Sequence, residues 1–145
     1  MNPRRKAREI ALTFLYQWDV RGEDVLPEMD DLLVKDRREP DVADYVKALV
    51  HGTIEHREEI DRRISEAAEH WRIERMAVLD RNVMRMATYE MAFRKDDVPP
   101  KVAINEAIEL AKRFSTGESG AFVNGVLDRV KRGIEAQGSA PAEPG

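Results

Sequence analysis

The side chains best suited to chemistry in this sequence are aromatic rings placed among basic residues. Phe114 and Phe122 fall at the edges of the apolar stripes of two helical segments, on either side of a Gly/Ser/Thr turn at residues 116–120. At about 100° per residue, helical geometry predicts that they face each other across this turn. Between residues 112 and 132, five basic residues oppose two acidic ones. Such a pattern is typical of sites that bind single-stranded nucleic acid, because bases stack on aromatic rings and phosphates bind cations. Alternatively, both rings close the core beside the turn.

A second candidate site lies at the N-terminus, where Arg4, Arg5, Lys6 and Arg8 form a basic run. Positive charge at a helix N-terminus opposes the helix dipole, so the run needs a reason other than helix stability. An external anion such as phosphate is the simplest one, and a solvated helix end is the alternative. Tyr16 falls opposite the apolar stripe of the same helix. We interpret it as a further stacking ring, or as a ring that packs on a neighbouring loop.

The acidic and histidine residues give no comparable signal for catalysis. Glu90 lies within the apolar stripe of its helix, where a carboxylate requires partners. We expect it to be a structural tie to the backbone amides at the start of the next helix, with help from Asn105, rather than a catalytic acid. His51 and His56 are five residues apart and do not share a helix face, and no phosphate-binding or nucleophile motif occurs. We therefore expect no metal, no cofactor and no catalysis.

Helical periodicity runs through nearly the whole chain and predicts an all-α fold. The expected helices cover residues 3–20, 29–38, 40–54, 60–71, 75–94, 102–114 and 119–132. The absence of cysteine fits a reducing cytoplasm, and no apolar run approaches the length that spans a bilayer. No hydrophobic segment of the signal-peptide kind follows the basic start. The net charge of −4 confines any nucleic-acid site to a local patch.

Four motifs together resemble the NusB family of bacterial transcription antitermination factors. They are RRKAREIALTFLYQWD at 4–19, LDRNVMRMATYEM at 79–91, VPPKVAINEAIELAKRF at 98–114 and FVNGVLDRV at 122–130. The resemblance implies one all-helical domain over residues 1–134. It consists of about seven helices in two packed subdomains, roughly 1–72 and 73–134. Composition predicts a disordered tail over residues 135–145.

The resemblance also implies a function. NusB proteins are non-catalytic adapters that bind the boxA element of ribosomal-RNA transcripts as a heterodimer with NusE, and they join NusA, NusG and RNA polymerase. By motif match, the family's RNA-binding positions are Arg4, Arg5, Lys6, Tyr16, Phe114, Glu118, Ser119 and Phe122. The segment that faces NusE falls around Asp80 and Arg81. Ala121 stands where some members carry a lysine, so one phosphate contact is expected to be absent.

Parts of the sequence also fit two other functions. A similar helical domain forms part of some ribosomal-RNA methyltransferases, but no cofactor-binding domain follows it in this chain. The second is a protein-only interaction module or homodimer, in which the same aromatic and basic surface packs against another subunit. The sequence does not separate this alternative from RNA binding.

Overall fold

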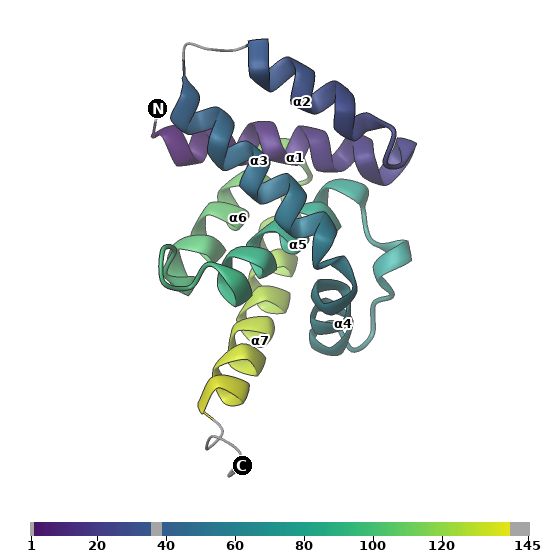
Figure 1. The fold of residues 1–145 in the computed structure, drawn as a ribbon. Coiled ribbons are helices and arrows are strands. Elements are labelled where there is room, and N and C mark those ends of the chain that lie inside the picture. The colour runs from purple at the N-terminus through teal and green to yellow at the C-terminus, as the bar shows by residue number, and fades with distance from the viewer. Residues whose placement is uncertain (1, 36–38, 140–145) are drawn as a thin grey trace.

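The computed structural model describes residues 2–35 and 39–139, and all regular secondary structure in these ranges is helical (Figure 1). A one-turn 3-10 helix, Ile73–Arg75, precedes the central helix. The seven α-helices are α1 (Pro3–Arg21), α2 (Val25–Lys35), α3 (Pro40–Glu55), α4 (Arg57–Ala67), α5 (Val78–Phe93), α6 (Pro100–Phe114) and α7 (Ser119–Ser139). The expected all-α fold is confirmed.

Local sequence explains where several helices begin and end. The Asn2 side chain caps α1 by accepting a hydrogen bond from the backbone N–H of Arg4 at 2.8 Å. Proline occupies the first turn of α1, α3 and α6, where a missing N–H breaks no intrahelical bond. Gly22 ends α1 with φ of +94°, a conformation that other residues rarely adopt.

Helix α5 forms the centre of the molecule and packs against α1, α3, α4, α6 and α7 (Figure 1). Every residue from Asn82 to Met91 is buried. A helix surrounded on all sides also buries residues that lie outside its apolar stripe. Met84 and Met91, which fall outside the stripe read from the sequence, are therefore buried as well.

Glu90 of α5 is buried among charged and polar partners from two other helices. Its side chain is 1% exposed and accepts hydrogen bonds from Arg8 of α1 at 2.9 and 3.1 Å. The Tyr45 hydroxyl of α3 donates a further bond to it. Burial and the charge of Glu90 raise the pKa of the Tyr45 phenol, which therefore remains a donor at neutral pH. The predicted structural tie is correct, but its predicted partners, the helix amides and Asn105, are wrong.

A second polar network joins α1, α4 and α5 around Asp19. Arg81 donates to both carboxylate oxygens of Asp19, at 2.6 and 2.7 Å, and Asn82 donates at 2.8 Å. Arg85 bridges Asp19 at 2.9 Å and Asp61 at 2.8 Å. Burial opposes the charge on Asp19, but the hydrogen bonds from Arg81 and Asn82 hold the pKa of Asp19 below its ordinary value.

This network predicts a pH-dependent stability difference between the protein and Asp19→Asn. The folded-state pKa of Asp19 lies below the ordinary 3.8. Its contribution is therefore present above that pH and is lost as the pH falls through the folded pKa. We expect Asp19→Asn to lower the free energy of unfolding by about 2–3 kcal/mol at pH 7 and by less at pH 3. Urea unfolding at both pH values measures this, and an equal gap at both would contradict it.

Helices α3 and α5 approach each other closely at Gly52. A Cβ atom added there would lie 2.2 Å from the ring of Tyr89, which is buried. Gly52→Ala should therefore lower the free energy of unfolding by about 1–3 kcal/mol, because the buried ring must move. Gly125 of α7 is the matched control, since an added Cβ there meets nothing within 4 Å. Gly125→Ala should be neutral or stabilise by up to about 1 kcal/mol. Equal thermal shifts in the two variants would contradict this packing.

The predicted disordered tail is wrong over residues 135–139, because α7 continues through Ser139. Ile134 still packs against the core, so the helix does not end at residue 132. One turn further on, Arg63 of α4 donates a hydrogen bond to Gln137 at 2.6 Å. This anchor lets helix formation carry on through residues that composition alone assigned to the tail. Residues 140–145 of the expected tail lie outside the described residues.

Candidate nucleic-acid interface

Two of the predicted RNA-binding rings, Tyr16 and Phe114, line one open hollow. Tyr16 lies opposite the buried face of α1 and is 41% exposed, while Phe114, the last residue of α6, is 44% exposed. We call this the α1–α6 hollow. Its lining consists of Glu9, Leu12, Thr13, Tyr16, Gln17, Leu79 and Phe114. The guanidinium of Arg113 lies 5.1 Å from the centre of the Phe114 ring. The hollow thus offers exposed rings with a cation beside one of them.

The third predicted ring, Phe122, lines a different hollow. Its ring meets Trp71 edge-to-face, with centroids 5.7 Å apart and planes at 73°. We call this the α5–α7 hollow. Its lining consists of Trp71, Arg75, Met76, Ala77, Asp80, Thr116, Glu118, Ser119 and Phe122. The expectation that Phe114 and Phe122 face each other is wrong, because Phe122 turns toward the connection between α4 and α5.

The two hollows are neighbours. Leu79 lines the first and the next residue, Asp80, lines the second, so both open beside the first turn of α5. An extended chain that crosses this turn would meet Tyr16 and Phe114 on one side and Phe122 on the other.

Trp71 is the ring that the sequence interpretation missed. The expected helix over residues 60–71 includes it, but α4 ends at Ala67 and Trp71 is 59% exposed. No glycine or proline marks this helix end. The available signal is the polar sequence around Trp71, where Glu69, His70 and Arg72 are all charged or titratable. A large ring in such a run has no apolar neighbours to pack with.

Ser119 lies at the bottom of the α5–α7 hollow rather than on its rim. It is buried, its hydroxyl donates to Asp80 at 3.1 Å, and it lies 2.9 Å from the Ser115 hydroxyl. An RNA contact through this hydroxyl would have to compete with these bonds. Glu118, by contrast, is exposed beside it. Ser119 is thus placed to hold Asp80, and Glu118 to meet a ligand.

Asp80 and Arg81, the predicted partner-binding pair, are both engaged inside the molecule. Asp80 is 8% exposed, and within the described part of the chain its Oδ1 atom has no hydrogen-bond partner. A buried acceptor without a donor is costly, which favours a ligand that brings one. The bidentate pair with Asp19 raises the pKa of Arg81 and occupies its guanidinium. Asp80 also lines the same hollow as Phe122, so the two predicted surfaces are not separate.

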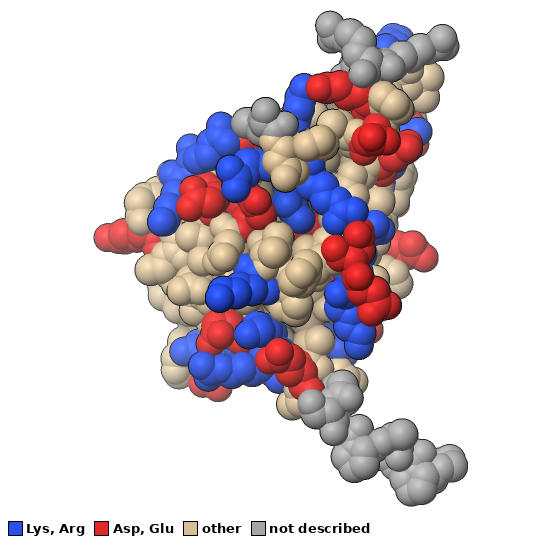
Figure 2. All heavy atoms as spheres, turned by 90° about the vertical axis from the view of Figure 1, so that its left-hand side faces the viewer, with Lys and Arg blue, Asp and Glu red and all other residues tan. Residues whose placement is uncertain are grey.

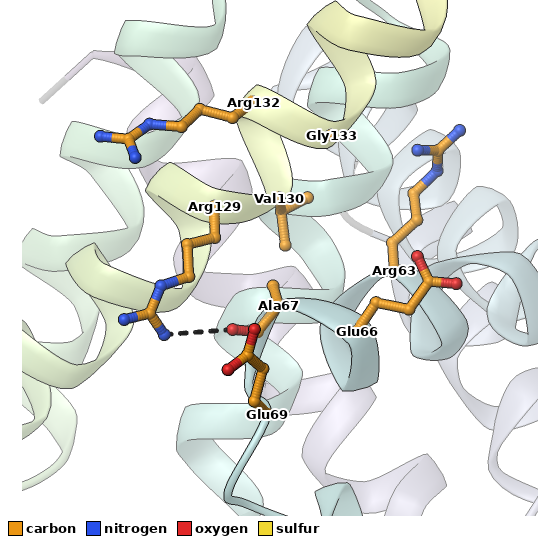
Figure 3. Close-up of a pocket in the computed structure, with 8 residues that line it drawn as sticks. All are labelled: Arg63, Glu66, Ala67, Glu69, Arg129, Val130, Arg132 and Gly133. Atoms are coloured by element: carbon orange, nitrogen blue, oxygen red, sulfur yellow. Dashed lines mark hydrogen bonds between the residues drawn. The ribbon is translucent and has the colours of Figure 1, made fainter.

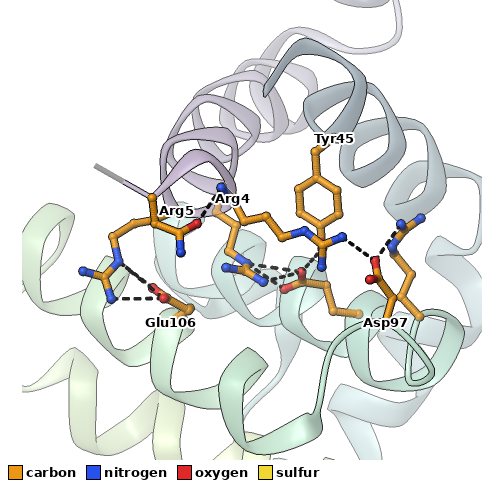
Figure 4. A network of polar contacts seen from close by, with 9 residues as sticks. Arg4, Arg5, Tyr45, Asp97 and Glu106 are labelled. Carbon is orange, nitrogen blue, oxygen red and sulfur yellow. Dashed lines mark hydrogen bonds and ion pairs between the residues drawn. The ribbon is translucent and has the colours of Figure 1, made fainter. Parts of the chain in front are cut away.

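The predicted phosphate-binding residues of the N-terminus are each paired with a carboxylate of the protein itself. Figure 4 shows the Arg4–Asp97 and Arg5–Glu106 pairs. Arg4 lies 2.7 Å from Asp97, and Lys6 lies 2.5 Å from Glu39. Arg5 makes a bidentate pair with Glu106, and two of the contacts in this pair are 3.0 Å long. The hydrogen bonds and charge of Glu106 raise the pKa of Arg5.

These pairs change the interpretation of the basic run. The protein supplies the anions for which the sequence suggested an external ligand. Arg8 is buried against Glu90 and cannot reach a phosphate. On the face drawn in Figure 2, basic and acidic side chains lie side by side instead of forming a uniformly basic field.

A third hollow, between α4 and α7, contains three arginines (Figure 3). Arg129 donates to the backbone carbonyl of Ala67 at 3.2 Å. Arg63 pairs with Glu59, and Arg132 pairs with Asp128 on its own helix. Each guanidinium therefore already has a partner. Arg129, which the sequence placed near the two phenylalanines, lines this hollow and neither of the aromatic ones.

Across residues 2–35 and 39–139, His, Asp and Glu side chains do not gather into any group of three that could hold a metal ion. In the same part of the chain, no helix has the length and apolar character needed to cross a membrane.

Exposed aromatic rings in open hollows, set in an all-helical fold, define a class of helical proteins suited to hold an extended partner rather than to enclose a small substrate. The chain belongs to the NusB family, whose model matches residues 5–132. The transcription antitermination protein NusB of Symbiobacterium thermophilum is 46% identical over 145 aligned residues, which cover 94% of each chain. The resemblance carried by the four sequence motifs is confirmed.

Solved structures agree with this assignment. A structure of T. maritima NusB is 39% identical, with a TM-score of 0.79 over 91% of this chain and 92% of that one. A chain from the crystal structure of the antitermination factors NusB and NusE in complex with double-stranded RNA is 31% identical. Its TM-score is 0.77, over 92% of this chain and 98% of that one.

Proposed function

We propose that this protein is a non-catalytic adapter of transcription antitermination that binds boxA RNA as a heterodimer with NusE. The observation that carries the proposal is the pair of neighbouring hollows with exposed rings at the first turn of α5. The likeness to a NusB chain solved with NusE and double-stranded RNA supports both ligands. We further propose that this complex joins NusA, NusG and RNA polymerase in the cytoplasm.

Each hollow has a distinct role in this proposal. Bases stack on Tyr16 and Phe114 in the α1–α6 hollow, and on Phe122 and Trp71 in the α5–α7 hollow. In the latter, the exposed Glu118 is the acceptor that a base can reach. Acceptors favour bases that present an amino group and repel phosphate, so they add sequence preference more than affinity.

The NusE contact is proposed to lie around the first turn of α5. Because Asp80 is buried and Arg81 is bound to Asp19, neither is a free surface charge. Charge reversal at Asp80 would thus disturb the hollow as well as any partner contact. Arg75 is exposed, but it lines the same hollow, so a substitution there tests this surface only if NusE binding and RNA binding are measured separately.

Fluorescence anisotropy with a labelled boxA RNA and a scrambled control tests the proposal. We expect tighter binding to boxA than to the scrambled RNA, and a further gain when NusE is added. Equal weak binding to both RNAs, unchanged by NusE, would contradict it.

One observation favours the protein-only or homodimer alternative, namely that the N-terminal cations are already neutralised by carboxylates. Sizing at several protein concentrations distinguishes the two. Self-association that competes with RNA would indicate that a second copy covers the same surface.

A further inference from the structure

Four cations border the α1–α6 hollow and the start of α1, and each is held by one carboxylate. We call Arg4, Arg5, Lys6 and Arg113 the cation row. Their partners, in the same order, are Asp97, Glu106, Glu39 and Glu9. Four positive charges thus face four negative ones. Arg94, which also pairs with Asp97, adds a fifth positive charge, and Glu109 adds a fifth negative charge close to Arg5. The cation row as it stands has no excess charge with which to attract a polyanion.

The pairs are open to exchange. The Arg5 and Arg113 side chains are half exposed, whereas Glu106 and Glu9 are the more covered members of the same pairs. Exposed ion pairs of this kind are weak, so a phosphate can replace the carboxylate at the guanidinium without unfolding anything. The carboxylate stays behind at the site, since it belongs to a helix.

Glu9 and Glu106 lie where such an exchange matters most. Glu9 lines the α1–α6 hollow together with Tyr16 and Phe114. Its partner Arg113 is also the cation over the Phe114 ring. Glu106 holds Arg5 by three contacts of 3.0 to 3.3 Å. A strand with a base on Phe114 would bring a phosphate close to Glu9 and Arg113.

We propose that Glu9 and Glu106 set the RNA affinity of this protein by holding Arg113 and Arg5 in place of RNA phosphates. RNA binding is then an exchange of carboxylate for phosphate at each guanidinium. This inference rests on the proposed RNA-binding function and adds two residues that lower the affinity for RNA. Their effect has a definite sign, because neutralising either carboxylate must strengthen binding. If the carboxylates only oriented the arginines for RNA, the same change would weaken binding.

The exchange also predicts the salt dependence. A cation that releases a carboxylate and takes a phosphate frees no net counterion, because the released carboxylate recruits a cation from solution. The wild-type slope of log affinity against log salt should therefore be shallower than about −0.7 per cation of the row. Each neutralised carboxylate should steepen the slope by about 0.7.

The test uses the full chain, a labelled single-stranded boxA RNA, and the variants Glu9→Gln, Glu106→Gln and their combination. Glu28→Gln is the matched control, since Glu28 pairs with Arg21 at 2.7 Å near the opposite end of α1. We expect about threefold to tenfold tighter binding for each single variant near 0.1 M salt, because one unit charge close to a phosphate has about that effect in water. Glu28→Gln should stay within about twofold of wild type.

The outcomes separate this inference from the function on which it rests. Wild-type binding with no gain or a loss in Glu9→Gln and Glu106→Gln overturns the inference and leaves RNA binding intact. Binding by the variants but not by the wild type supports the inference in its strongest form. No binding by any of them, with unchanged thermal unfolding, overturns both.

Discussion

Replacing Glu90 by alanine is expected to lower the free energy of unfolding by about 3–5 kcal/mol. The change leaves the buried guanidinium of Arg8 without its anion and the Tyr45 hydroxyl without its acceptor. A buried charge without a partner is among the most destabilising defects in a protein core. Because these residues come from α1, α3 and α5, the loss should affect the whole molecule. Urea denaturation followed by circular dichroism measures it.

A double variant gives the control for this prediction. Arg8→Met combined with Glu90→Leu removes both charges and keeps most of the side-chain volume, so it should recover much of the stability lost in Glu90→Ala. Removing one member of the exposed Arg21–Glu28 pair should cost less than about 1 kcal/mol. If Glu90→Ala lowered the free energy of unfolding by no more than the change in the exposed pair does, the buried Arg8–Glu90–Tyr45 network would not stabilise the fold as proposed.

The second large effect is expected in RNA binding. Phe122→Ala should weaken boxA binding by about 5- to 150-fold, which corresponds to about 1–3 kcal/mol for one stacked base. Tyr16→Ala should have a similar effect. Since the two rings lie in different hollows, their effects should multiply in the double variant. Phe122→Ala and Trp71→Ala should combine to less than the product of the single effects, because these rings touch each other. Anisotropy titrations of the three single and two double variants measure this.

Phe93→Ala is the control for the aromatic substitutions. Phe93 is partly exposed like Tyr16, but it stacks on His56 with centroids 4.0 Å apart and lines neither aromatic hollow. RNA affinity should be nearly unchanged in this variant. A loss as large as that of Phe122→Ala would show that the aromatic substitutions act through stability rather than through stacking.

The fold could be predicted from the sequence because most helices have one apolar face. Apolar residues at helical spacing locate α1, α3, α6 and α7. Prolines mark where α1, α3 and α6 begin, and Gly22 marks where α1 ends. The sequence also located α5, at 75–94, but a stripe on one face could not show that this helix is buried on all sides. Its polar residues, such as Glu90 and Asn82, are satisfied by side chains from other helices, and such partners do not follow from local spacing.

The candidate site could be predicted only in part, for a related reason. Helical geometry placed Tyr16 opposite the apolar stripe of its helix and Phe114 at the edge of another stripe, and the structure brings them into one hollow. It could not show that Phe122 turns toward Trp71, because that depends on how the chain leaves α4. Nor could it show the ion pairs of the basic run. Arg5 and Glu106 are 101 residues apart in sequence, and only tertiary packing makes them neighbours.

The most direct test of RNA binding in these hollows is an NMR titration of the two tryptophan indole N–H signals with boxA RNA. Trp71 is exposed beside Phe122, whereas Trp18 is buried in the core and serves as an internal reference. The signal that disappears in Trp71→Phe identifies Trp71. We expect the Trp71 signal to shift progressively as boxA RNA is added, while the Trp18 signal stays in place. An unmoved Trp71 signal in a protein that has demonstrably bound the RNA would contradict the proposed interface.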